Sequence, residues 1–492
     1  MQLSKSDYML YLKHPAWLWL KKHDKEKLPA MDDNTQAMLD AGNIFESYAE
    51  RRFPDGLRLG FTNPEEYQEL ADATKQILDE DVQTIFQGRF VAGDLTCIID
   101  VLDRVEDNAF DLYEIKASSR PKPEHEYDLA FQVTVLEAAG YTIRNISVIH
   151  VNSSYMRDGD VDYEALTKMT DITVKVRERM GYTRAKIDEA LELISQTERP
   201  DISPRHADLG GLPEWLTIYR SLATDLPPYS IYDLCSAKAK MLGELEDLGI
   251  RLISDIPDDF KLSPKQRLQL EVIRSGEPII HNDKIKDFLK GLTYPLYFLD
   301  YETLTSIVPY FDGLRPYGQL PFQYSLHVLD EPGAELRQVG YLHRDETCPA
   351  EALTKSLREH LGDTGSVITW NMSFEKGCNK LMGEMLSDCF DFCDQLNGRV
   401  VDLMLPFSKN WYVHKDFAGS ASIKKVLPVL VPELSYKTLG IQEGLGAQRL
   451  WMESVLDGKR QDEKEHILSD LDEYCGLDTL AMVKIHEKLA AL

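Results

Sequence analysis

The pattern of hydrophobic and polar positions predicts a helix, a polar helical segment and a β-hairpin in the first third of the chain. An apolar stripe at helical spacing runs through about 34–53, and the turn residues 54–56 end it. A polar helical segment follows over 64–86. The stretches 90–104 and 110–117 alternate apolar and polar residues as strands do, with turn-forming residues between them. We therefore expect an α/β domain over 1–200.

The middle of the chain, 201–290, is rich in proline and glycine at its start and then turns to short helical patterns. Ser263-Pro264 has the form of a helix start with proline in the first turn. We expect a linker and a helical connector here. A helix-hairpin-helix unit that binds DNA, near Leu248-Gly249-Ile250, is a weaker alternative to a plain connector.

The last region, 291–492, begins with the apolar stretch Tyr297-Phe298-Leu299, which predicts a strand that ends in acidic residues. A second strand is expected over 322–328 and a third one up to Tyr341. A helix over 350–361 and a strand over 367–370 follow. Three consecutive strands, a helix and a further strand predict a mixed sheet with flanking helices.

Composition limits the classes of protein that fit. The chain has 492 residues, 43% of them hydrophobic, which is enough for several cores. Its formal net charge of −27 argues against a broad surface that binds nucleic acid nonspecifically. A local concentration of basic residues is compatible with either phosphate binding or a solvated helix face. It consists of Lys175, Arg177, Arg179, Arg184 and Lys186.

The chain contains seven cysteines at irregular positions, without a CxxC pair, which disfavours a disulfide framework and a zinc ribbon. A reducing cytoplasm fits this usage. No apolar run reaches membrane-spanning length and no secretory signal is evident, so we expect no membrane partner. The sequence leaves protein partners and oligomeric state open.

The expected hairpin brings candidate catalytic residues together. A three-residue loop places Asp100 opposite Glu114, within one residue of register error, and Lys116 shares a face with Glu114. A surface ion pair across two strands is the structural alternative. Asp100 with Glu114-Ile115-Lys116 resembles the core of the PD-(D/E)XK nuclease superfamily, in its RecB-like branch.

This resemblance implies a restriction-endonuclease-like α/β/α core and further site residues. Gln132, on the helix that follows, matches the glutamine motif of the branch, although Leu136 stands where a tyrosine is usual. Glu46 matches a position that often supplies another metal ligand. Relatives often hold an iron–sulfur cluster through four cysteines, but His14 stands at the first of these positions, so we expect no cluster.

Asp300 and Glu302 lie two residues apart on the strand that opens the last region, so their side chains share a face. Two carboxylates this close repel each other unless a cation lies between them, and Mg²⁺ or Mn²⁺ prefers such oxygen ligands. The alternative is a polar strand end exposed to solvent.

Later segments supply further candidates. Glu375 follows a strand and opens a helix, and Tyr474 and Asp478 share a helix face at i,i+4 spacing. Together with Asp300 and Glu302, these residues resemble the DEDD family of 3′–5′ exonucleases, in its tyrosine subclass. The resemblance implies an RNase H-like fold over 291–492. Glu375 departs from the usual aspartate.

The remaining candidates have supporting roles. Asp402 is assigned to structure or to support of the site. The helix start with Lys424 and Lys425 could face phosphates or be a solvated face.

The two resemblances together cover most of the chain. The arrangement of the two domains resembles an uncharacterised bacterial family that joins them. These resemblances imply a nuclease dependent on Mg²⁺ or Mn²⁺ that acts on DNA, in repair or in defence against foreign DNA. Asp100, Glu114 and Glu46 would bind metal in one centre. Asp300, Glu302, Glu375 and Asp478 would do so in the other. A ribonuclease, or a binding or scaffolding protein with inactive centres, are the alternatives.

Overall fold

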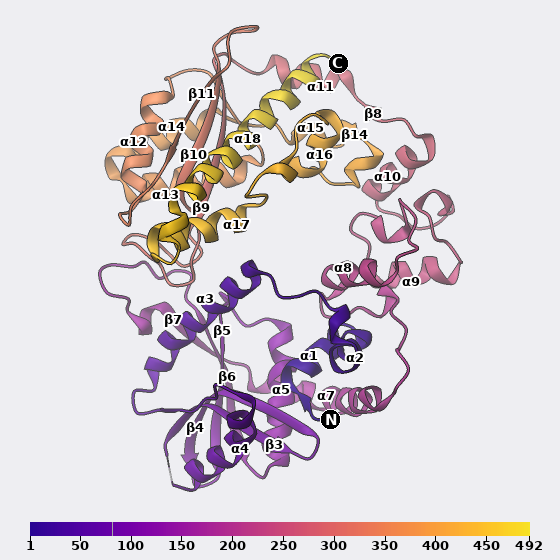
Figure 1. The fold of residues 1–492 in the computed structure, drawn as a ribbon, viewed down its shortest axis with the longest axis vertical. Helices are drawn as coiled ribbons and strands as arrows, with labels where there is room; N and C mark the ends of the chain where they lie inside the picture. Colours follow the sequence, from indigo (N-terminus) through magenta and orange to yellow (C-terminus); the bar gives the residue numbers. More distant parts are fainter. Residues whose placement is uncertain (81) are drawn as a thin grey trace. The chain divides into compact units, whose positions relative to one another are not determined.

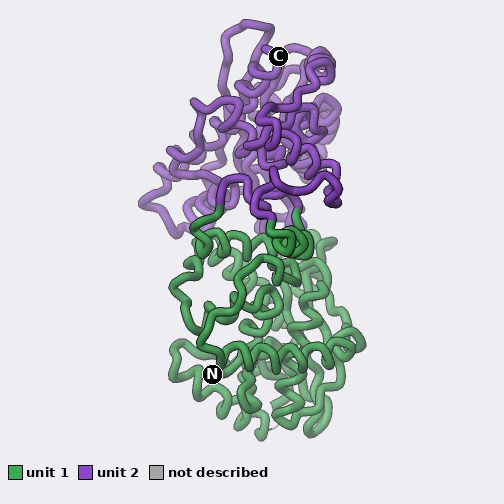
Figure 2. The backbone as a smooth tube through the Cα atoms, turned by 90° about the vertical axis from the view of Figure 1, so that its right-hand side faces the viewer, with its two compact units in different colours: residues 1–226, 237–249 green, residues 227–236, 250–492 purple. Residues whose placement is uncertain are grey.

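The computed structural model describes residues 1–80 and 82–492, and the chain forms two compact units. Figure 2 shows unit 1, residues 1–226 and 237–249, in green and unit 2, residues 227–236 and 250–492, in purple. The segment expected to be a connector, 201–290, is thus divided between the units. Both units combine helices with a β-sheet, which confirms the predicted α/β class.

Unit 1 is built on a twisted sheet in the order β2-β3-β4-β5-β6-β7, with β1 beside β4. Strands β3, β4 and β5 are antiparallel neighbours, and β5 and β6 are parallel. The strands are β1 (Leu3–Ser4), β2 (Leu57–Arg58), β3 (Thr84–Ala92), β4 (Leu95–Glu106), β5 (Ala109–Lys116), β6 (Thr142–Val151) and β7 (Thr167–Asp171).

Several helices of unit 1 pack against this sheet (Figure 1). The helices of unit 1 are α1 (Lys5–Lys13), α2 (Pro15–His23), α3 (Asp33–Ala49), α4 (Pro64–Asp79), α5 (Pro123–Ala138), α6 (Tyr163–Leu166), α7 (Thr173–Ser195), α8 (Leu212–Leu222) and α9 (Ala239–Asp247). Helix α5 packs against α7 and against several strands, so it carries Gln132 into the core beside the sheet.

Two expected boundaries in unit 1 were wrong. The single strand expected over 90–104 is split by a turn at Gly93, whose φ of 60° lies in the left-handed region that suits glycine. The helical segment expected over 64–86 ends at Asp79, and Thr84 already begins β3. The predicted register of the hairpin β4–β5 is confirmed, because Val101 pairs with Tyr113.

The main sheet of unit 2 has the order β11-β10-β9-β12-β13. Strand β10 is antiparallel to both β9 and β11, whereas β12 is parallel to β9 and β13 is parallel to β12. The strands are β9 (Leu296–Leu304), β10 (Leu320–Leu329), β11 (Arg337–Leu342), β12 (Ser366–Thr369) and β13 (Val400–Asp402); β8 (Ile279–Ile280) pairs with β14 (Tyr412–Val413).

Helices cover both faces of this sheet. Helices α12, α13 and α14 lie on one side and the long α18 crosses the other (Figure 1). The helices of unit 2 are α10 (Pro264–Ser275), α11 (Asn282–Lys290), α12 (Ala350–His360), α13 (Met372–Met385), α14 (Phe390–Arg399), α15 (Leu405–Ser408), α16 (Ile423–Leu430), α17 (Gly444–Trp451) and α18 (Lys464–Ala490).

The alternation along β9 determines where its acids point. Tyr297 and Leu299 belong to the core under α12–α14, whereas Leu296 and Phe298 belong to the core under α18. Because side chains alternate along a strand, the even-numbered acids at the end of β9 face α18. Among residues 1–80 and 82–492, no helix is long and apolar enough to cross a membrane.

Candidate metal centre

Three carboxylates meet where β9 faces α18. Asp300 and Glu302 from β9 and Asp478 from α18 each offer an oxygen, and these oxygens lie within 4.8 Å of one another. Glu302 and Asp478 are only 7% and 8% exposed. In the part of the chain that the structure describes, this is the only group of three or more potential metal-ligating side chains that meets this distance criterion.

Burial and mutual repulsion disfavour full ionisation of this cluster. Burial, followed by the charge of Asp478, raises the pKa of Asp300 and that of Glu302 well above the ordinary range. Burial raises the pKa of Asp478 to about 6, although a hydrogen bond from Tyr436 opposes the shift. A divalent cation would offset the free-energy cost of ionising these buried carboxylates. Carboxylate oxygens are also the ligands that Mg²⁺ and Mn²⁺ prefer. The three side chains therefore fit such an ion.

Glu375 lies near this cluster but is not one of the three. It is in the first turn of α13, which begins after Asn371 in a left-handed conformation (φ 78°). The side chain is 1% exposed, its Oε2 has no hydrogen-bond partner, and burial raises its pKa to about 8. Its charge also contributes to the raised pKa of Asp300, after burial, Asp478 and Glu302. A buried carboxyl oxygen without a partner fits a role as a further ligand.

Asp402 has the supporting role assigned to it. Its Oδ1 accepts hydrogen bonds from the backbone N–H groups of Asn371 and Met404, at 3.1 and 2.9 Å. It therefore fixes the turn between β12 and α13 and, through that turn, the start of the helix that carries Glu375.

A cavity of about 240 Å³ opens beside the carboxylates. The residues that line it are Asp300, Tyr301, Glu302, Trp370, Phe374, Ile423, Lys424, Gly444, Tyr474, Asp478 and Met482. Burial, and next the charge of Asp478, raises the pKa of Tyr474 above its ordinary value. The phenol is therefore protonated at neutral pH, so it can donate a hydrogen bond but does not act as a base.

Sequence analysis did not predict Tyr436 as a residue of this site, and it left open whether Lys424 faces phosphates or solvent. The hydroxyl of Tyr436 donates a 2.6 Å hydrogen bond to Oδ1 of Asp478. Lys424 lies with its Nζ 5.8 and 5.9 Å from the ring centroids of Tyr436 and Tyr474, and its charge lowers the pKa of Asp478. Tyr436 is on a short 3₁₀ turn outside any motif, so no sequence signal identified it.

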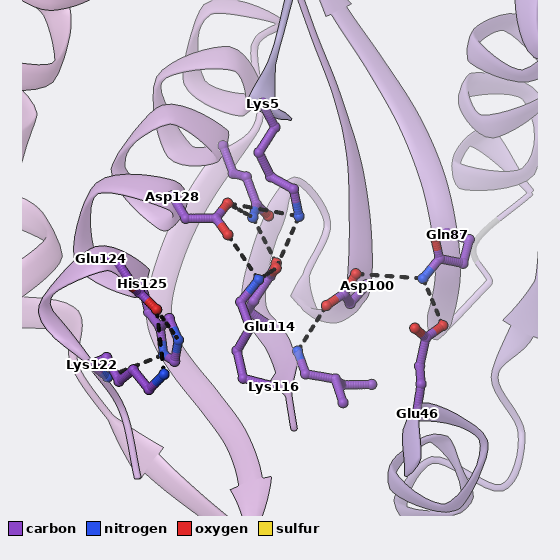
Figure 3. A network of polar contacts seen from close by, with 12 residues as sticks. Lys5, Glu46, Gln87, Asp100, Glu114, Lys116, Lys122, Glu124, His125 and Asp128 are labelled. Carbon is purple, nitrogen blue, oxygen red and sulfur yellow. Dashed lines mark hydrogen bonds and ion pairs between the residues drawn. The ribbon is translucent and has the colours of Figure 1, made fainter. Parts of the chain in front are cut away.

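The candidate centre of unit 1 is a dense polar network (Figure 3). Lys116 donates to Glu114 at 2.6 Å and to Asp128 at 2.9 Å, and Lys5 reaches the same two carboxylates at 2.9 and 3.7 Å. Gln132 donates to Glu114 Oε2 at 2.6 Å and to Asp128 Oδ1 at 2.9 Å. Lys5 and Asp128 were not among the predicted site residues. Asp128 lies on α5, four residues before Gln132.

Asp100 and Glu46 lie at the other side of this network. Asp100 accepts a 2.8 Å hydrogen bond from the backbone of Ile115, and burial, then Glu114, raises its pKa to about 7. Gln87 donates to Glu46 at 2.8 Å and to Asp100 at 3.5 Å. The structure thus gathers all predicted residues of this centre in one region. In this arrangement nitrogen donors contact both oxygens of Glu114, so an ion bound to Glu114 would have to replace at least one of them.

Two other features noted in the sequence make local contacts within unit 1. In the local basic concentration on α7, Arg177 and Arg184 pair with Glu137, and Arg179 pairs with Glu126. His14 is fully buried and stacks on Trp215 with ring centroids 3.8 Å apart.

Comparisons with known proteins give relatives without an assigned activity. The family described as "Domain of unknown function (DUF2779)" matches residues 297–422, which include Asp300, Glu302 and Glu375 but not α18. The "Uncharacterized protein MG366 homolog" of Mycoplasma pneumoniae is 24% identical over 221 residues, 41% of this chain and 33% of that protein. The "Uncharacterized protein UU173" of Ureaplasma parvum is 24% identical over 284 residues, 53% of this chain and 41% of that protein. The chain spans between a third and about two fifths of the length of the curated relatives it matches.

Proposed function

We propose that the protein is a divalent-metal-dependent nuclease that hydrolyses phosphodiester bonds of DNA, with its main active centre in unit 2. The observation that carries this proposal is the cluster of Asp300, Glu302 and Asp478, held within 4.8 Å beside a buried phenol. The order of strands in unit 2 and the identity of these residues support a DEDD-type 3′–5′ exonuclease of RNase H-like fold. The RecB-like residues of unit 1 would form a second centre.

The carboxylates of Asp300, Glu302 and Asp478 would hold Mg²⁺ or Mn²⁺, with Glu375 as a further ligand once it is ionised. Divalent ions bound there would supply Lewis acidity for the attacking water and for the departing 3′ oxygen. Side chains of the protein would orient the reacting groups. Tyr474 would donate a hydrogen bond that orients the attacking water, and Tyr436 would keep Asp478 in place.

The cavity beside the carboxylates favours a strand end as substrate. Trp370 and Phe374 give it an apolar wall against which a sugar or base can pack, and Lys424 brings a positive charge next to the acids. Its volume of about 240 Å³ is below the usual range of about 300–1,000 Å³ for sites that enclose a small ligand, so it would receive part of a strand end rather than a duplex.

The first experiment measures degradation of end-labelled single- and double-stranded DNA and RNA with Mg²⁺ or Mn²⁺. We expect stepwise loss from 3′ ends of DNA that Asp300→Asn abolishes. Glu487→Gln is the matched control, because Glu487 lies on α18 but is exposed and paired with Lys484. Lys116→Ala tests the second centre and should remove a separate cutting activity.

The alternative function, a nucleic-acid-binding or scaffolding protein, is favoured by one observation: nitrogen donors occupy both oxygens of Glu114. If the wild type cuts no substrate with either metal and Mn²⁺ does not raise its melting temperature, the nuclease proposal is wrong. Preference for RNA over DNA under these conditions would change the substrate class to ribonuclease.

A further inference from the structure

The side chain of Lys5 reaches into the candidate centre of unit 1 from outside any motif. Lys5 is the first residue of α1, and its Nζ lies 2.9 Å from Glu114 Oε1 and 3.7 Å from Asp128 Oδ1 (Figure 3). Its side chain is 23% exposed, whereas Glu114 is 1% exposed. The side chain of Lys5 thus keeps partial contact with solvent while it pairs with a buried carboxylate, as does that of Lys116, which is 26% exposed.

Lys5 and its neighbours use both oxygens of Glu114. Oε1 accepts from Lys5 and from Lys116, and Oε2 accepts from Gln132. A divalent ion bound to Glu114 must replace at least one of these donors. Lys116 is on β5 only two residues from Glu114, so the strand itself keeps it close, and Gln132 is fully buried on α5.

Lys5 is the donor that comes from outside the strand and the helix that carry the other donors. It occupies the first turn of α1, where the positive end of the helix dipole disfavours a cation. Its position therefore depends on the two carboxylates rather than on its own helix. The long side chain can swing into solvent without any change in the backbone.

We propose that Lys5 is a resident counter-cation of the unit 1 centre, which competes with a divalent ion for Glu114 and keeps the centre closed to metal until it swings out. The inference rests on the proposed function, because it takes Asp100 and Glu114 as metal ligands. It explains why the residues of this centre come together without forming an open set of carboxylate ligands. The lysine neutralises the acids that the metal would otherwise neutralise.

The test measures Mn²⁺ binding by full-length chains in which Asp300→Asn and Asp478→Asn remove the unit 2 cluster. In this parent background, Lys5→Met should bind Mn²⁺ at least about tenfold more tightly, as measured by calorimetry and by the electron paramagnetic resonance signal of free Mn²⁺. Lys5→Arg keeps the charge and should bind as the parent does. Lys27→Met is the matched control, because it removes a lysine from an exposed ion pair with Asp24. Adding Asp100→Asn to Lys5→Met should abolish the gain.

The outcomes separate this inference from the proposed function. If Asp100-dependent Mn²⁺ binding exists but Lys5→Met leaves it unchanged or weakens it, Lys5 is not a competitor and the inference is wrong. If no variant binds Mn²⁺ through Asp100, both the inference and the unit 1 half of the proposal fail. The unit 2 half is tested separately on chains that retain Asp300 and Asp478.

Folding of the variants is checked by circular dichroism, with Lys5→Gln as a second neutral substitution. Both neutral variants should be less stable than the parent in EDTA, because Glu114 and Asp128 lose a counter-charge. Addition of Mn²⁺ should restore the stability of both variants. Variants that stay unfolded in Mn²⁺ would overturn the inference.

Discussion

The hydroxyl of Tyr436 donates a 2.6 Å hydrogen bond to Oδ1 of Asp478, and both side chains are only 8% exposed. This bond connects the short turn at Tyr436–Thr438 to the helix that carries two site residues. It also lowers the pKa of Asp478 against the larger effect of burial. Tyr436 thus keeps the carboxylate both in place and more readily ionised.

Tyr436→Phe should weaken Mn²⁺ binding at the unit 2 cluster. Without the donor, the pKa of Asp478 rises further, so a bound ion has to displace a proton at neutral pH. We expect a loss of about tenfold in affinity and about 1–3 kcal/mol in the free energy of unfolding, the usual effect of removing a hydrogen bond to a buried charged group. Mn²⁺ titration and urea denaturation measure the two effects.

Tyr412→Phe is the control for this prediction, since it removes a hydroxyl from the same unit outside the cluster. Equal Mn²⁺ affinity for Tyr436→Phe and the wild type would show that the bond has no role in metal binding.

Glu375→Gln should make the metal-free protein less sensitive to pH. Burial raises the pKa of Glu375 to about 8, so its contribution to stability is fully present below about 4.5 and is lost as pH rises through about 8. The amide does not titrate. The stability of the variant relative to the wild type should therefore increase by a few kcal/mol between pH 5 and pH 8.5 in EDTA.

Chemical denaturation at several pH values measures this difference. Glu384→Gln on the same helix is the control, because Glu384 is exposed and paired with Lys380. A pH-independent difference between Glu375→Gln and the wild type would mean that Glu375 is ionised throughout.

The sequence predicted the parts of both sites that depend on local periodicity. The period of two along β9 placed Asp300 and Glu302 on one face, and the period of the helix did the same for Tyr474 and Asp478. The register of the hairpin β4–β5 was also predicted, although the loop has two residues rather than three and a bulge between Arg104 and Glu106 compensates for the difference. These features require only local geometry and a recognisable turn.

The parts that sequence reasoning missed depend on contacts between distant segments. Lys5 and Glu114 are 109 residues apart, and Tyr436 and Asp478 are 42 residues apart. A lysine at a helix start and a tyrosine in a short turn have no pattern that indicates their partner. The turn at Gly93 had a signal, Gly93-Asp94, but the apolar alternation on both sides concealed it.

His14→Phe should destabilise unit 1 in a pH-dependent manner. The Nδ1 of His14 accepts from the backbone of Ala16 at 3.1 Å, and Nε2–H donates to the carbonyl of Ser203 at 3.0 Å. Burial lowers its pKa to about 4, so the stability it contributes is present above about 6.5 and is lost as pH falls through about 4.

Phenylalanine keeps the stack on Trp215 but leaves two buried backbone groups unpaired, which costs roughly 2–4 kcal/mol at pH 7. The difference from the wild type should shrink toward pH 4.5. Urea denaturation followed by tryptophan fluorescence measures it, with exposed His466→Gln as control. A difference that does not change with pH would contradict a neutral buried His14.

Lys424→Ala should weaken binding of single-stranded DNA more than Lys425→Ala does. The two lysines are adjacent in α16 and both are exposed, but only Lys424 lines the cavity beside the carboxylates. If Lys424 binds one phosphate of a single strand, its removal should reduce the slope of log affinity against log salt by about 0.7. Fluorescence anisotropy at several salt concentrations, in Ca²⁺ with Asp300→Asn to prevent cleavage, measures both the affinity and the slope.

Equal effects of the two substitutions would assign both lysines to a general electrostatic surface. An effect confined to Lys424, with unchanged Mn²⁺ affinity, would place the phosphate in the cavity.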